Sequence, residues 1–242
     1  MSSNKTSMWE HKTVFNFGKF YLVIRFIARK FMRPYRFLEE TLPKTDEPTV
    51  FVSHHENLKG PIKLLLWLPF FVRIWILSSI VDQEDCYNHY VNYTFTERFG
   101  MPRKLAEWIA LPASHIVAWG TNSVQAIPVF RSSKKIKRTF DMSVDALDNN
   151  QPILILPDID YADSSTHIGQ MYEGFLAIDR IYFKKTGKRV RFLPIYASYD
   201  THQIRCGNPI YFTGDKHFRQ ERSEIAELIH KEMERIISLE TR

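Results

Sequence analysis

Four short apolar runs, separated by helix-length segments, constrain this chain of 242 residues more than any other feature. The clearest is the run PILILP, which is long enough for a buried central strand and has no polar residue inside it. Strands that alternate with helices predict an α/β fold with a mostly parallel central sheet flanked by helices. The strands predicted from these runs are residues 49–53, 123–130, 152–157 and 190–196, and a further short strand is predicted at residues 209–212.

Residues 18–33 have the spacing of an amphipathic helix, ended by Pro34. Three arginines, Arg25, Arg29 and Arg33, fall four residues apart and therefore share one face. Their positive charge beside large aromatic residues favours a helix that lies on an anionic membrane surface. Packing of the same helix against the protein core is the alternative. We therefore predict two parts, residues 1–47 as a membrane-associating helix with a linker and residues 48–242 as the α/β domain.

A second apolar stretch, residues 63–81, is interrupted by Pro69 and Arg73. Its uncharged pieces are shorter than the roughly 18–20 residues that a membrane-spanning helix needs. A buried helix is the expectation for this stretch, and a shallow membrane insertion is the alternative. The other predicted helical segments are residues 83–112, 132–148, 169–186 and 219–239.

The composition indicates which kinds of partner and which cellular compartment to expect. A net charge of +6 favours anionic partners such as phospholipid surfaces, phosphorylated metabolites or an acidic carrier protein. Glycine-rich nucleotide-binding motifs do not occur in the sequence. The only two cysteines, Cys86 and Cys206, have no metal-site or disulfide spacing, so a reducing, cytosolic-side environment is the simplest prediction.

The first predicted strand ends in the polar cluster SHHENLKG. A strand end that delivers histidines and a carboxylate to a loop is a common way to place a catalytic base. We expect His54 to be the base, because imidazole suits proton transfer near neutral pH, and Glu56 to be the carboxylate that orients it. A polar turn with surface histidines is the alternative.

Two further strand ends carry charged side chains. Arg131 follows the second strand, and Lys134 and Lys135 come early in the predicted helix that begins at residue 132. Cations at the positive end of a helix favour an anion-binding site, here for a phosphate group. A solvated charged helix is the alternative. Asp158 follows the third strand, and ligands of parallel sheets bind where strands end.

These residues resemble the motifs of the glycerolipid acyltransferases, a family whose best-known members acylate lysophosphatidic acid. The family has four blocks, N-H-x-S-x-x-D, a strand that ends in a phosphate-binding arginine, F-P-E-G, and an apolar strand with a proline. Similar blocks occur in the same order over about residues 48–198. They are SHHENLK at 53–59, IPVFR at 127–131, LPDI at 156–159 and FLPI at 192–195.

The resemblance implies an O-acyltransferase that moves a fatty acyl group from acyl-CoA or an acyl carrier protein to a hydroxyl of a lysophospholipid or glycerol phosphate. It implies His54 as general base, Arg131 with Lys134 or Lys135 on the acceptor phosphate, and Asp158 in the acceptor site. It implies no cofactor and no metal. The expected place is the cytoplasmic face of a membrane, as a peripheral or monotopic protein.

The sequence departs from the family pattern at two places. Lys59 stands where the first motif has its aspartate, and a lysine cannot accept the imidazole N–H. Glu56 is then the nearest carboxylate for that role. The third block has Asp158 in place of glutamate and lacks the glycine.

Three alternatives to an active acyltransferase follow from the same residues. The first is a catalytically silent lipid-binding protein, which Lys59 favours. The second is a metal-dependent hydrolase built on His54, His55, Glu56 and Asp158, although the sequence has no H-E-x-x-H motif. The third is a nucleic-acid binder, which we do not expect, that would use the cations Lys184, Lys185, Lys188, Arg189 and Arg191.

Overall fold

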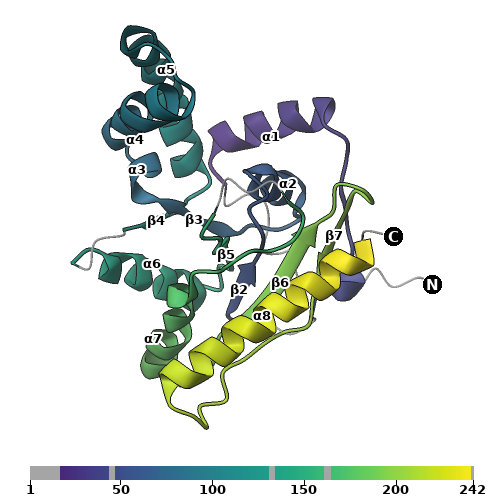
Figure 1. Cartoon of the computed structure of the whole chain (residues 1–242). Coiled ribbons are helices and arrows are strands. Elements are labelled where there is room, and N and C mark those ends of the chain that lie inside the picture. Colours follow the sequence, from purple (N-terminus) through teal and green to yellow (C-terminus); the bar gives the residue numbers. More distant parts are fainter. Residues whose placement is uncertain (1–16, 44–46, 131–133, 161–164, 241–242) are drawn as a thin grey trace.

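A mixed sheet of seven strands forms the centre of the protein, as a computed structural model shows (Figure 1). The structure describes residues 17–43, 47–130, 134–160 and 165–240. The strand order is β1-β7-β6-β2-β5-β3-β4, and every neighbouring pair is parallel except β6 and β7. This confirms the α/β class and the mostly parallel sheet. The strands are β1 Arg36–Phe37, β2 Thr49–Val52, β3 Arg73–Leu77, β4 Ile127–Val129, β5 Ile153–Ile155, β6 Arg191–Ala197 and β7 Gln203–Cys206.

Helices cover both faces of the sheet, because successive strand residues point to opposite sides. Val50 and Val52 of β2 pack into a core with α6, α7 and α8, whereas Phe51 between them packs into a second core with α1 and α2. The helices are α1 Lys19–Phe31, α2 Lys59–Trp67, α3 Ser78–Val81, α4 Gln83–His89, α5 Arg103–Ser123, α6 Ile136–Asp148, α7 Ala177–Thr186 and α8 Phe218–Glu240. Short 3-10 turns lie at Glu39–Thr41 and Glu173–Leu176, and a π-helix at Tyr90–Arg98.

The prediction of one buried helix over residues 63–81 was wrong. Helix α2 ends at Trp67, just before Pro69, and β3 begins at Arg73. Proline removes a backbone donor and restricts the residue before it, so the helix cannot continue. The remaining segment RIWIL is β-branched and aromatic, and it pairs with β5 and β4 inside the sheet.

Three predicted boundaries also shift. Helix α5 continues to Ser123, so the strand expected from residue 123 is only Ile127–Val129. Helix α6 begins at Ile136, which leaves Lys134 and Lys135 in the turn before it. The helix expected over residues 169–186 is α-helical only from Ala177.

Residues 36–37 lie in the segment predicted to be a linker, but they form β1 at the edge of the sheet. The predicted division of the chain at residue 47 stays a prediction.

Helix α1 places Arg25 and Arg29, two of the three arginines that share its predicted basic face, against the protein. Arg25 is 3% exposed, and its Nε and Nη2 atoms donate hydrogen bonds to the Leu66 and Leu68 carbonyls at 2.9 and 2.5 Å. Arg29 donates to the same Leu66 carbonyl at 2.7 Å. The last carbonyls of a helix lack intrahelical partners and attract cations, so these arginines cap the C-terminus of α2. Burial, and then the nearby Arg29, lowers the pKa of Arg25 to about 10, so it stays charged near neutral pH.

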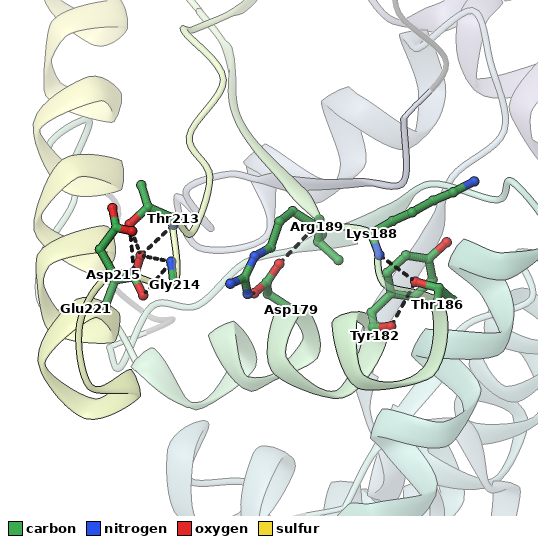
Figure 2. A network of polar contacts seen from close by, with 10 residues as sticks. Asp179, Tyr182, Thr186, Lys188, Arg189, Thr213, Gly214, Asp215 and Glu221 are labelled. Carbon is green, nitrogen blue, oxygen red and sulfur yellow. Dashed lines mark hydrogen bonds and ion pairs between the residues drawn. The ribbon is translucent and has the colours of Figure 1, made fainter.

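The turn between α7 and β6 contains a polar network (Figure 2). The buried Asp179 carboxylate accepts hydrogen bonds from Arg189 at 2.7 Å and from the Val190 N–H at 2.9 Å. Beside it, Glu221 of α8 accepts from the Thr213 and Gly214 N–H groups. Arg191 is fully buried against Thr49. These contacts fix the start of β6. They also place Arg189 and Arg191, two of the five cations considered for nucleic-acid binding, in hydrogen bonds within the protein.

Among the described residues, none of the helices combines the length and the apolar character required to cross a membrane.

Replacing Arg25 by methionine should lower the free energy of unfolding by about 1.5–3 kcal/mol, because two carbonyls at the end of α2 lose a charged donor. Urea unfolding measures this difference. Arg33→Met is the matched control, since Arg33 is exposed beyond the end of α1 and should change stability by less than about 0.5 kcal/mol. Equal losses in both variants would contradict the capping role.

Candidate active site

The pairing of β2 with β5 brings two polar strand ends together. Val52 lies opposite Ile155, and the Ser53 N–H continues the ladder to the Ile155 carbonyl at 3.0 Å. Both strands run in the same direction, so the residues that follow them emerge at the same edge of the sheet. His54 follows β2, and Asp158 follows β5.

His54 and Asp158 form a buried hydrogen-bonded pair. The imidazole Nδ1 lies 2.5 Å from Asp158 Oδ1, and the two side chains are 1% and 3% exposed. The second carboxylate oxygen, Oδ2, accepts the His55 N–H at 2.9 Å. The carboxylate is therefore held at both oxygens, which fixes the orientation of the imidazole that it contacts.

The structure corrects the expected partner of His54. We predicted Glu56 as the orienting carboxylate, but both Glu56 oxygens bind other groups: Oε2 accepts from Lys63 Nζ at 2.6 Å and Oε1 accepts from the Tyr196 hydroxyl at 3.0 Å. Asp158 was expected in the acceptor site and instead contacts the imidazole. Lys59, at the motif aspartate position, is exposed at the start of α2.

Asp158 is positioned by a chain segment that folds back on itself. Asp158 forms an antiparallel bridge with Met171. On either side of it, the Ile159 N–H donates to the Gln170 carbonyl at 3.0 Å and the Tyr172 N–H donates to the Pro157 carbonyl at 2.8 Å. Backbone hydrogen bonds flank the carboxylate on both sides, so its position does not depend on side-chain packing alone.

Glu56 anchors the turn that follows His54. Glu56, Lys63 and Tyr196 are 4%, 5% and 3% exposed, and Lys63 also donates to the Ala197 carbonyl at 3.1 Å. Burial, with the Glu56 charge as the next cause, raises the pKa of Tyr196 far above its usual value, so its hydroxyl stays a donor. The cluster ties the turn to α2 and to the end of β6. Sequence analysis did not identify Lys63 and Tyr196 as partners of Glu56. The only signal was that Lys63 follows Glu56 by seven residues.

This turn has an unusual backbone. Glu56, Asn57 and Leu58 have φ angles of +43°, +49° and +72°, in the left-handed region that side-chain-bearing residues seldom adopt. Gly60 then passes so close to His54 that an added Cβ would lie 2.1 Å from the His54 carbonyl oxygen. Any other residue at position 60 would displace the backbone beside the imidazole.

The pKa values of the two adjacent histidines are shifted in opposite directions. Burial would lower the pKa of His54, but the hydrogen bond and charge of Asp158, aided by the Ser165 carbonyl, outweigh it and raise the pKa above the usual value. For His55, burial is the largest influence and its pKa is lowered. His55 Nδ1 accepts the Leu58 N–H at 3.1 Å, which requires an unprotonated nitrogen.

The second nitrogen of His54 also has a partner. Nε2 lies 2.9 Å from the Ser165 carbonyl oxygen, which can only accept a hydrogen bond. With Asp158 accepting from Nδ1, both ring nitrogens act as donors, so this arrangement holds the doubly protonated imidazolium. For His54 to act as a base, Nε2 would first have to exchange the Ser165 carbonyl for another group and lose its proton.

A cavity of about 190 Å³ lies beside this pair. The pair itself is almost fully covered, with side chains 1% and 3% exposed, although both residues contribute to the cavity wall. The walls of the cavity are formed by His54, Asp158, Ile159, Asp160, Gly169 and Gln170.

The predicted phosphate-binding residues lie at another strand end. Arg131 lies outside the described residues, while Lys134 and Lys135 are exposed in the turn before α6. Thr139 of α6 fixes the end of β4, because its hydroxyl accepts the Phe130 N–H at 3.1 Å and donates to the Pro128 carbonyl at 2.8 Å. In the sheet, β5 and β3 lie between β2, which His54 follows, and β4, which precedes the lysines, so the structure does not bring these lysines to His54.

Within the described ranges, no three His, Cys, Asp or Glu side chains are arranged to hold a metal ion.

In the comparisons with known proteins, no family model matches the chain and no curated protein matches it significantly. The resemblance to glycerolipid acyltransferases rests on the motifs alone and stays a prediction.

We expect His54 and His55 to titrate on opposite sides of about pH 6.5, the usual histidine value. NMR titration of the ring protons measures both. Asp158→Asn should lower the pKa of His54, because the largest influences that oppose burial, the hydrogen bond and charge of Asp158, are lost. A His54 pKa unaffected by this change would contradict the pairing.

The same pKa shift links stability to pH. A raised folded-state pKa stabilises the protein fully below the unfolded value, and this contribution is lost as the pH rises through the folded-state pKa. The stability advantage of the wild type over Asp158→Asn should therefore be largest at acidic pH and should shrink as the pH rises through the raised folded-state pKa of His54, as urea unfolding would show.

Lys63→Met should lower the free energy of unfolding by about 3–5 kcal/mol, because it leaves the buried Glu56 carboxylate without its cation. Adding Glu56→Gln to this variant should restore part of the loss. Lys231→Met is the control, since the Lys231–Glu227 pair is 67% and 66% exposed and is worth at most about 1 kcal/mol. Similar losses for both lysines would show that the buried pair has no special role.

Proposed function

We propose that this protein is an O-acyltransferase that moves a fatty acyl group from a thioester donor, acyl-CoA or an acyl carrier protein, to a hydroxyl of a lysophospholipid or glycerol-phosphate acceptor. It acts at the cytoplasmic face of a membrane, as a peripheral or monotopic protein. The observation that carries this proposal is the buried His54–Asp158 hydrogen bond at the wall of a cavity. A carboxylate on Nδ1 orients the imidazole so that Nε2 can transfer a proton once it has exchanged the Ser165 carbonyl for a substrate hydroxyl.

Two further observations support the assignment. The four motif-like blocks occur in the order of the acyltransferase family, and the first and third of them carry His54 and Asp158. The cavity of about 190 Å³ is smaller than the roughly 300–1,000 Å³ of sites that enclose a whole drug-sized ligand. It suits the reacting end of a substrate, with the acyl chain and the remaining donor outside it.

The reaction begins when the acceptor hydroxyl replaces the Ser165 carbonyl at Nε2 of a neutral His54. Nε2 takes the hydroxyl proton while the oxygen attacks the thioester carbonyl carbon, giving a tetrahedral intermediate and an imidazolium. Asp158 stays ionised, holds Nδ1–H and stabilises the imidazolium charge. The C–S bond then breaks, the thiolate takes the proton from Nε2, and the ester product leaves.

The acceptor phosphate requires cations at a fixed distance from the hydroxyl. Arg131 is the residue that the motif assigns to this role, with Lys134 and Lys135 as its neighbours. These lysines precede the first turn of α6, where backbone N–H groups also favour anions. This part of the proposal rests on the resemblance and on the positive charge of the turn.

A catalytically silent lipid-binding protein is the second candidate. The contact between His54 Nε2 and the Ser165 carbonyl favours it, because the nitrogen that would act as base is occupied. In this case the imidazolium would be a structural cation between Asp158 and the loop at Ser165.

The decisive test is a transfer assay with labelled acyl-CoA and acyl carrier protein, offered lysophosphatidic acid and other lysolipids. His54→Ala and Asp158→Asn should each lower the rate by about 10²–10⁴-fold, because the base or its orienting carboxylate is lost. The wild-type rate should rise with pH through the raised pKa of His54, since only neutral imidazole accepts a proton.

Glu56→Gln is the matched control, because Glu56 contacts Lys63 and Tyr196 rather than the imidazole. It should lower the rate by less than about tenfold when equal amounts of folded protein are compared. Loss of transfer in Glu56→Gln with full activity in Asp158→Asn would reverse the assignment of the two carboxylates. No transfer by the wild type to any acceptor would favour the silent alternative.

A further inference from the structure

The chain between β3 and β4 forms a helical arm that extends from the sheet beside α1, with α5 as its longest helix (Figure 1). The buried face of α5 is made almost entirely of small residues. Ala106, Ala110, Ser114 and Ala118 are spaced four apart and face inward, followed by Thr121. Small residues allow α5 to lie close to its neighbours, but they bury little apolar area.

The large apolar residues of α5 point outward instead. Trp108 is 81% exposed and Trp119 is 59% exposed, and three other large apolar side chains share this surface. A helix of a water-soluble domain normally shows the opposite arrangement. The other three are Leu105, Leu111 and Ile116.

Helix α1 has the same inversion. Arg25 is buried in capping contacts, whereas Phe26 and Phe31 are 63% and 85% exposed. Val23, Ile24 and Ile27 are also exposed on this helix. Two helices that both present their large apolar side chains to solvent require a partner that covers them.

The two exposed faces are continuous. The rings of Phe20 on α1 and Trp119 on α5 meet at 5.9 Å between centroids. The ends of the helices are also joined, since the Gly18 N–H donates to the Ser123 carbonyl at 2.7 Å and the Tyr21 N–H donates to Ser123 Oγ at 2.8 Å. A partner that covers one helix at this junction therefore meets the other.

The charges of α1 and of the first turn of α5 are positive, whereas the acids of this arm lie at Asp82, Glu84, Asp85, Glu97 and Glu107. Helix α1 contains no acidic residue, and Lys19 and Lys30 are exposed on it. The Lys30 ammonium lies 4.5 Å from the Phe26 ring centroid, so its charge is carried at the edge of the apolar face. Arg103 and Lys104 begin α5, and Glu107, the single acid of this helix, is paired with Arg103.

We propose that α5 and α1 together form a two-helix docking surface for a bilayer of anionic phospholipid, with α5 as a full part of the contact. Tryptophan and phenylalanine enter the region between headgroups and acyl chains, and the flanking cations meet the lipid phosphates. This surface rests on the proposed membrane location and names the contact that would produce it. It does not depend on acyl transfer, because it is defined by exposure and charge outside the catalytic site.

The test is co-sedimentation of the full chain with phosphatidylcholine vesicles that contain phosphatidylglycerol, compared with pure phosphatidylcholine vesicles. The paired variants are Trp108→Glu/Leu111→Glu on α5 and Phe26→Glu/Phe31→Glu on α1. The control is Leu228→Glu/Leu239→Glu, which makes the same charge change at two exposed leucines of α8. Each helix pair should partition at least tenfold more weakly than this control on the anionic vesicles.

A conservative variant keeps the test valid if a glutamate pair fails to fold. Trp108→Phe/Trp119→Phe should still bind anionic vesicles but should lose most of the tryptophan quenching that brominated lipids cause in the wild type. Quenching that persists unchanged would place these side chains outside the bilayer and overturn the proposal.

Other results would also overturn it. Binding of the α5 pair equal to that of the control would leave α1 as the sole contact, and absence of wild-type binding to anionic vesicles would remove the lipid partner. A wild-type dimer in light scattering that the α5 pair dissociates would assign the surface to a second copy of the chain. None of these measurements requires acyl transfer. A negative result for membrane docking is therefore distinct from a negative result in the transfer assay.

Discussion

The parallel pairing of β2 with β5 joins two segments whose polar ends would otherwise have no reason to meet. It aligns Val52 with Ile155, and from that register His54 and Asp158 leave the sheet at one edge and form a 2.5 Å contact. The site depends on this backbone pairing, because both residues follow directly from buried strand residues. The surrounding contacts, from the segment that folds back at Met171 to the Glu56–Lys63 pair, hold that edge in place.

Much of the fold could be predicted from sequence, because short apolar runs and helical periods are local signals. The strands at 49–52, 153–155 and 191–197 lie where those runs indicate. Strand order is not a local signal, and so the sequence could identify His54 and Asp158 as strand-end residues without pairing them. Proximity in sequence favoured Glu56, but its left-handed backbone directs the carboxylate to Lys63 and Tyr196.

The local nature of sequence signals also explains why the orientation of α1 could not be predicted. A helical pattern shows that two faces differ, but it does not show which face points inward. Apolar burial would turn the phenylalanines inward, yet the unpaired carbonyls at the end of α2 provide strong partners for Arg25 and Arg29. Once the arginines face α2, the apolar residues must face outward, and α5 repeats this arrangement with alanines inside and tryptophans outside.

The separation of the site along the chain affects when it can form. His54 and Asp158 are 104 residues apart, and the Ser165 carbonyl comes later still. During synthesis the histidine leaves the ribosome long before β5 exists, and until then its imidazole has no carboxylate to orient it. Incomplete chains therefore carry no His54–Asp158 pair, which forms only after the central sheet has assembled.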